Sequence, residues 1–97
     1  MLTKLHNVCV IPTTLDEFIE LQELVVALGG EWANIGKAIY REWPLHPDKA
    51  IVLDVETSLC MYFVSISTIG IYQNRRRAPI GNVLLTLKTL VNIKENS

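Results

Sequence analysis

The sequence predicts an α+β fold, in which a small antiparallel sheet is packed by one N-terminal amphipathic helix and the C-terminus forms a helix or a strand. Two observations lead to this prediction. A capped segment with apolar residues at helical spacing lies near the N-terminus, and short runs rich in β-branched and aromatic residues follow it. The length of 97 residues and the 49% of hydrophobic residues indicate one folded domain, spanning residues 1–97.

A short strand followed by a helix is predicted at the N-terminal end. Residues 7–11 are rich in β-branched side chains and form the expected strand. Thr14 and Glu17 have the spacing of a capping box, in which each side chain binds the backbone N–H of the other residue at a helix start. The helix is expected to run to about Leu28, because Gly29-Gly30 can adopt the left-handed conformation of a C-cap.

The middle of the chain is predicted to build the sheet. The expected strands are 31–33, 37–41, 50–55, 59–66 and 69–73. Asn34-Ile35-Gly36 has the composition of a hairpin turn between the first two strands. Residues 43–48 contain two prolines, which remove two backbone donors, so this segment is expected to be a loop.

Residues 83–93 fit two patterns. Their leucines and valines can line one face of a helix, and alternate residues can also line one face of a strand. We favour a helix because Pro79 and Asn82 can start one. A strand is the alternative, because five of the eleven residues are β-branched.

Charge is divided unevenly along the chain. Residues 1–56 hold four Lys or Arg and nine Asp or Glu, which gives a net charge of −5. Residues 57–94 hold five Lys or Arg and no acidic residue, which gives +5. Such an asymmetry says little about the fold, but it bears on which partners the protein attracts.

The main candidate site lies in the basic segment, where Arg75, Arg76 and Arg77 follow Tyr72 closely. Guanidinium groups supply planar pairs of donors for phosphates or carboxylates, and Tyr72 can supply a stacking face. The alternative is that the arginines are solvated or pair with the acidic face of the N-terminal helix. That face consists of Asp16, Glu20 and Glu23.

A second candidate site is the loop that contains Trp43 and His46, close in sequence to Trp32 and Tyr40. Aromatic side chains beside a proline-bounded loop can form a pocket for a ligand or a protein partner. The alternative is that these aromatic residues cover the core of a small domain.

The motifs of common enzymes and metal sites are missing from the sequence. It has two histidines, no Cys-x-x-Cys pair, no nucleophile elbow and no glycine-rich phosphate loop. We therefore expect no metal, no cofactor and no enzymatic activity. Cys9 and Cys60 lie in apolar runs and are expected to be buried, reduced thiols. The chain shows neither a secretion signal nor a membrane-spanning run, which predicts a cytoplasmic location.

Three motifs between residues 7 and 63 occur together. A short strand precedes a Thr-Leu-Asp-Glu-Phe helix start, the helix ends Leu-Gly-Gly-Glu-Trp, and Ala-Ile-Tyr leads into Trp43-Pro44. Phe18, Leu21, Gln22 and Leu28 form a similar arrangement to an "E-F-x-x-L-Q-x-x-L" helix, in which the last position of the pattern is held by Val25 in this chain. In these features the chain resembles the small accessory proteins of T4-type tailed phages, which serve host takeover or anti-defence roles.

The resemblance implies a non-enzymatic, phage-encoded binding protein of the host cytoplasm. Its partner would be a host protein or defence system that it inhibits, and it could form a homo-oligomer. The alternatives are an RNA-binding inhibitor, such as a toxin-neutralising protein, and a protein that sequesters an anionic nucleotide signal. The matching motifs are structural, so no functional residue is carried over.

Overall fold

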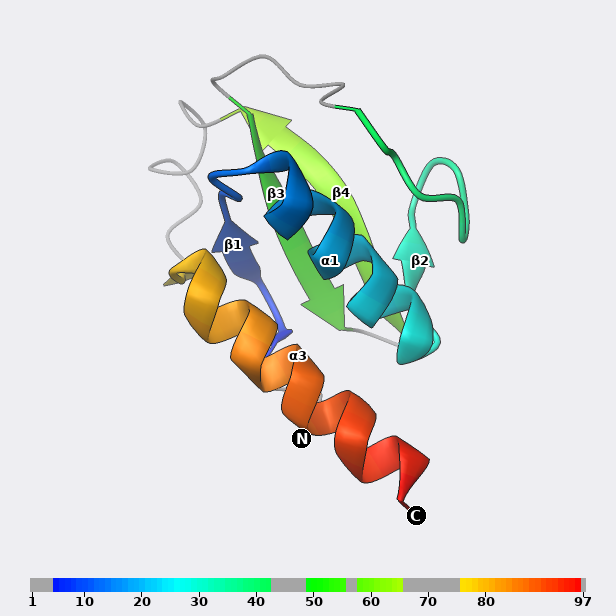
Figure 1. The fold of residues 1–97 in the computed structure, drawn as a ribbon. Helices are drawn as coiled ribbons and strands as arrows, with labels where there is room; N and C mark the ends of the chain where they lie inside the picture. The colour runs from blue at the N-terminus through cyan, green and yellow to red at the C-terminus, as the bar shows by residue number, and fades with distance from the viewer. Residues whose placement is uncertain (1–4, 43–48, 56–57, 66–75, 97) are drawn as a thin grey trace.

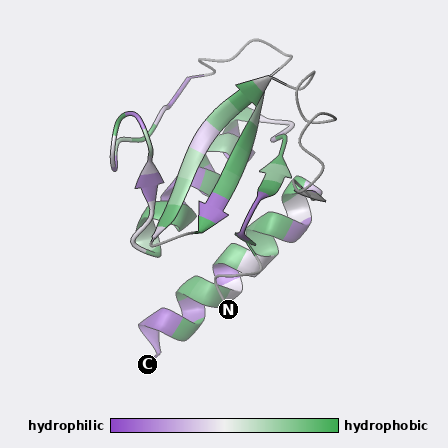
Figure 2. Ribbon diagram, turned by 180° about the vertical axis from the view of Figure 1, so that it is seen from behind, coloured by the Kyte–Doolittle hydropathy of each residue, from purple (hydrophilic) through white to green (hydrophobic). Residues whose placement is uncertain are grey.

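A computed structural model of the chain describes residues 5–42, 49–55, 58–65 and 76–96 (Figure 1). The elements in chain order are β1 (Val8–Val10), α1 (Leu15–Ala27), β2 (Glu31–Trp32), β3 (Lys49–Val55), β4 (Leu59–Ser65), β5 (Arg76–Arg77) and α3 (Ile80–Glu95). The predicted α+β class is confirmed, and the ambiguous C-terminal segment is a helix. Helices α1 and α3 pack on the same face of the sheet, so both lie behind it in Figure 2.

The described strands form a five-stranded sheet in the order β2-β4-β3-β1-β5. At its centre, β3 is antiparallel to both β4 and β1. At its edges, β2 runs parallel to β4 and β5 runs parallel to β1. The sheet is therefore mixed, which differs from the antiparallel sheet that the sequence predicted. The parallel pairs join strands that are distant in sequence, so the local patterns that identify hairpins give no signal for them.

The start and the end of α1 follow the prediction. The Glu17 N–H donates to Thr14 Oγ1 at 3.1 Å, and the Thr14 N–H donates to Glu17 Oε1 at 3.1 Å, which completes the capping box. The Thr13 N–H also donates to Glu17 Oε1, at 2.9 Å. At the other end, Gly29 has a φ of +86°, a left-handed conformation that glycine adopts without a steric penalty.

The predicted hairpin over residues 31–41 is only partly present. A bridge between Trp32 and Gly36 closes a tight turn, but residues 37–41 form no strand. Both backbone hydrogen bonds that Tyr40 would use in a sheet go instead to the side chain of Gln22. The amide of a single side chain therefore takes the place of the neighbouring strand.

An aromatic cluster fills the core between α1 and the β2 edge of the sheet. The rings of Trp32 and Phe63 have centroids 4.4 Å apart, and Tyr40 lies 5.3 Å from Trp32. Phe18 from α1 packs against all three rings. Trp32 is only 1% exposed, so Trp32 and Tyr40 belong to the core, as the second interpretation of these aromatic residues predicted.

The two cysteines lie in different environments. Cys9 is buried on the sheet face opposite the helices, beside Ala50 and Val52. Cys60 is half-buried, because it sits near the end of the sheet between Glu31 and Asp54 in the strand register. The prediction of burial is confirmed for Cys9 and wrong for Cys60.

Within the described residues, neither helix has the length and apolar character needed to cross a membrane.

Candidate functional site

The structure describes part of the predicted arginine site. Arg77 lies in β5 with an exposed side chain. For Arg76, the structure describes the backbone position in β5 and not the side chain. The other candidates lie outside the described residues; these are Tyr72, Arg75, Trp43 and His46. Arg77 is therefore the predicted site residue that the structure places on a surface.

The pairing of β5 with β1 determines where Arg77 points. Arg77 is the register partner of Cys9, and the Ala78 N–H extends the ladder by donating to the Cys9 carbonyl oxygen at 3.0 Å. Paired residues of neighbouring strands share a sheet face. Val8 and Val10 face the helices, whereas Cys9 faces away from them. Arg77 therefore stands on the sheet face opposite the helices, at the β5 edge.

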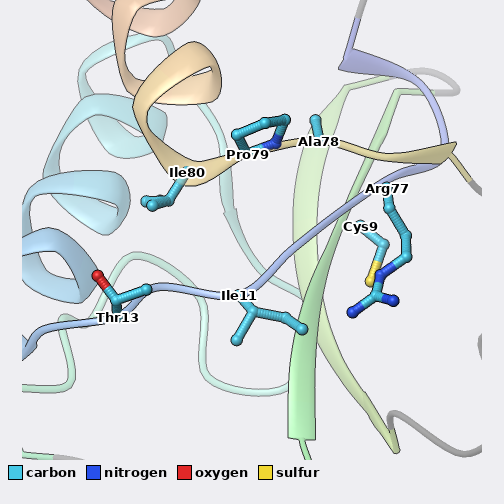
Figure 3. Close-up of a pocket in the computed structure, with 7 residues that line it drawn as sticks. All are labelled: Cys9, Ile11, Thr13, Arg77, Ala78, Pro79 and Ile80. Carbon is cyan, nitrogen blue, oxygen red and sulfur yellow. The ribbon is translucent and has the colours of Figure 1, made fainter.

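An open concavity of about 560 Å³ lies beside Arg77. Its lining, shown in Figure 3, consists of Cys9, Ile11, Thr13, Arg77, Ala78, Pro79 and Ile80. We call it the Arg77 concavity. Most of the described lining residues are apolar, and Arg77 is the one among them with a formal charge. The Thr13 hydroxyl already donates to the Glu17 carboxylate, so the guanidinium is the main polar group available to a ligand.

The N-terminus of α3 adds positive potential at the rim of the Arg77 concavity. Pro79 is the N-cap residue and makes no side-chain capping bond, and the first turn holds no acidic residue. The backbone N–H groups and the dipole of a 16-residue helix favour an anion at that end. At Gly81, in the same turn, an added Cβ would meet no atom within 4 Å.

The acidic face of α1, which was a predicted partner of the arginines, forms an ion pair with α3 instead. Glu20 Oε1 lies 2.7 Å from Nζ of Lys88, which belongs to α3. In the portions of the chain described, no ion pair involves Arg77. The predicted alternative, in which the arginines pair with this acidic face, is therefore not what the structure shows for Arg77.

A second polar group lies at the far end of β3, where His6 Nδ1 is 2.9 Å from Asp54 Oδ1. This pair links the chain before β1 to the sheet. Among the described residues, no group of three His, Cys, Asp or Glu side chains could hold a metal ion. The described lining residues of the Arg77 concavity include no His, Asp or Glu for acid–base chemistry. What this lining can do is bind an anion that carries apolar groups.

Sequence reasoning missed most of the concavity. Ile11 and Pro79 were visible as the end of a strand and the start of a helix, but nothing local brought them together. The parallel pairing of β1 with β5 does so, and it joins residues 68 positions apart, as in Val8↔Arg76. The apolar Ala78-Pro79-Ile80 run directly after the arginines was the local signal available.

A scan against protein-family models, a search of curated proteins and a search of solved structures each found no match to this chain.

Proposed function

We propose that this chain is a non-enzymatic binding protein that inhibits a host protein or defence system, and that it docks through the Arg77 concavity. The observation that carries the proposal is an exposed guanidinium beside an apolar depression of about 560 Å³. Arginine at the edge of an apolar pocket is a common anchor of protein–protein interfaces. The matching partner surface has a carboxylate next to a protruding apolar side chain.

The resemblance to accessory proteins of T4-type phages supports the inhibitory role. Many such proteins act by binding a host enzyme, its RNA or a small signalling ligand, and each of these modes requires a recognition surface and no catalytic group. The described lining residues, which are mostly apolar and include Arg77, can provide such a recognition surface. A net charge of −1 for the whole chain favours a protein partner over RNA, because dedicated nucleic-acid binders are strongly basic.

The volume of the concavity favours a second candidate function, the sequestration of an anionic nucleotide. Small-molecule sites commonly enclose roughly 300–1,000 Å³. In that case the guanidinium would bind a phosphate and the apolar lining would contact the base. An increase in melting temperature on adding a nucleotide, lost in Arg77→Gln, would favour this candidate.

The test is a capture experiment from nuclease-treated host lysate with three baits: the wild-type chain, Arg77→Gln and Arg41→Gln. Arg41 is also exposed but lies outside the concavity, so it controls for the loss of one positive charge. We expect one host protein to be retained by the wild type and by Arg41→Gln and lost by Arg77→Gln. The purified host protein should then show the same ranking of affinities. Equal retention by all three baits would contradict the proposed site. Capture by the wild type from untreated lysate that is lost in nuclease-treated lysate would favour RNA.

A further inference from the structure

We infer that the Arg77 concavity binds a carboxylate carried on an apolar stem, with the carboxylate at the guanidinium and the stem on the Ile11, Pro79 and Ile80 side chains. This inference rests on the proposed function and names the chemistry that the site recognises. The same chemistry could come from the C-terminal residue of a partner chain or from an internal Asp or Glu beside an apolar residue.

The charge of the described lining selects a carboxylate over a phosphate. Among the residues that the structure describes, the lining holds one guanidinium and no Lys, and the Thr13 hydroxyl donates to the Glu17 carboxylate. One guanidinium neutralises one negative charge, and its two parallel N–H donors match the two oxygens of a carboxylate. A phosphomonoester carries about −1.5 to −2 charges at neutral pH and would leave part of its charge unmatched.

The apolar stem follows from the rest of the lining. Ile11 continues β1 past its last paired residue, and Ala78-Pro79-Ile80 leads from β5 into α3 (Figure 3). These aliphatic groups make up most of the described lining beside the guanidinium. A ligand that consists of an anion alone would leave these groups in water, so affinity should rise as the stem becomes larger and more apolar.

The start of α3 strengthens the preference for an anion and offers a second way to test it. Gly81 occupies the second position of the helix, no side chain caps this end, and there is open space around an added Cβ. An Asp at this position would place a permanent carboxylate near the ligand and repel it. Asn has nearly the same shape without the charge, so the two variants differ mainly in electrostatics.

The first experiment uses 4-phenylbutyrate and its uncharged analogue 4-phenylbutyramide as probes, with binding followed by NMR. The NMR signals of the methyl groups of Ile11, Ala78 and Ile80 should shift as the acid is added, and these changes should saturate at high acid concentration. The amide should bind about tenfold more weakly, since a charge-assisted hydrogen bond of about 1.5 kcal/mol or more is lost. Arg77→Gln should lower the affinity for the acid by a similar factor, whereas Arg41→Gln should leave this affinity unchanged.

The second experiment compares Gly81→Asp with Gly81→Asn for the same acid. The Asp variant should bind at least about fivefold more weakly, and the Asn variant should match the wild type within about twofold. Equal affinity for acid and amide, or equal affinity of the Asp and Asn variants, would overturn the inference. Absence of shifts at the lining methyl groups would overturn it as well.

Short peptides identify the source of the carboxylate. A peptide with a free C-terminal leucine, its C-terminal amide, and an amidated peptide with an internal Glu-Leu pair are titrated in parallel. Binding of the free C-terminus alone assigns a chain end, and binding of the internal pair assigns a side chain. If the host partner depends on Arg77 but no acid binds, the inference fails and the proposed function stands. If the acids bind but the wild type and Arg77→Gln retain the host protein from lysate equally, the proposed function fails.

Discussion

The side-chain amide of Gln22 binds the backbone of Tyr40 in the way that a neighbouring strand would. Gln22 Nε2 donates to the Tyr40 carbonyl oxygen at 2.8 Å, and the Tyr40 N–H donates to Gln22 Oε1 at 2.7 Å. Gln22 Oε1 also accepts from Trp32 Nε1 at 3.0 Å, and Nε2 also donates to the Phe18 carbonyl oxygen at 3.1 Å. Gln22 is 0% exposed, so one buried amide satisfies polar groups of α1, β2 and the segment after the Gly36 turn.

Replacing Gln22 by Leu should therefore destabilise the protein strongly. Leucine fills a similar volume, but it leaves the Trp32 indole N–H and both backbone groups of Tyr40 without their partner. Each buried polar group left unsatisfied costs about 1–3 kcal/mol, so we expect a loss of about 3 kcal/mol or more in the free energy of unfolding. Denaturant unfolding followed by Trp fluorescence measures it.

The control for this prediction is Glu23→Leu. Glu23 is the next residue of α1 and is exposed, so its replacement should change the free energy of unfolding by less than about 0.5 kcal/mol. Similar unfolding midpoints for the Gln22 and Glu23 variants would mean that the Gln22 network contributes little.

The capping box gives a second prediction. Thr14→Ala removes the hydroxyl that accepts from the Glu17 N–H, and loss of an N-cap costs about 1 kcal/mol. Thr89→Ala is the matched control, because Thr89 is exposed inside α3 and alanine is the better helix former there. If Thr14→Ala and the wild type have the same denaturation midpoint and slope, the capping box makes no measurable contribution to stability.

The same box predicts how stability depends on pH. Hydrogen bonds from Thr13, and secondarily from Thr14, lower the pKa of the Glu17 carboxyl below its usual value of 4.5. The unfolded chain then binds more protons than the folded chain as the pH falls below about 4.5. The stabilisation is fully present above that value and is lost as the pH falls through the lowered pKa. Unfolding measured across this range in wild type and Glu17→Gln should show a shallower acid dependence in the variant; parallel curves would contradict the assignment.

The elements whose signals are local could be predicted from the sequence. Thr14 and Glu17 lie three residues apart, Gly29 directly follows the helix, and the apolar periodicity of α1 spans one continuous segment. The pairing of β3 with β4 could also be predicted, because only three residues separate the two strands in the sequence. In each case the interacting groups are near one another in the chain, where residue type and spacing determine the outcome.

The features that sequence reasoning missed depend on contacts between distant residues. The expected strand over residues 37–41 has a suitable composition. Instead of pairing with a strand, however, the backbone N–H and carbonyl of Tyr40 form hydrogen bonds with the side chain of Gln22, 18 positions earlier. The Arg77 concavity likewise arises because β5 pairs with β1. Arg77 could be chosen as a site residue from its charge, whereas its apolar neighbours could not, since ordinary aliphatic residues carry no functional signal of their own.

The two cysteines should react at different rates. Cys9 is 1% exposed, whereas Cys60 is half-buried near the sheet end. A thiol reagent should modify Cys60 in the native protein and modify Cys9 only when denaturant unfolds the sheet. Mass spectrometry of the labelled peptides distinguishes the two sites. Modification of Cys9 at the native rate of Cys60 would show that the sheet face around Ala50 and Val52 opens readily.

The last prediction separates a functional role of the arginines from a structural one. Arg77 is exposed and has no ion-pair partner among the described residues, and exposed charges contribute about 0–1 kcal/mol each. Replacing Arg75, Arg76 and Arg77 together by Ala should thus leave a folded protein with a nearly native unfolding midpoint. The same variant should lose binding to the host partner, because the positive charge of the site is gone.

Measuring both quantities on this one variant decides between the roles. A large loss of stability would mean that the arginines are paired within the fold, against the observed exposure of Arg77. Native stability together with full binding would mean that the partner is recognised elsewhere. The segment that contains Trp43 and His46 would then be the stronger candidate. Aromatic side chains are frequent anchors of protein interfaces, and this segment is the remaining site that the sequence indicates.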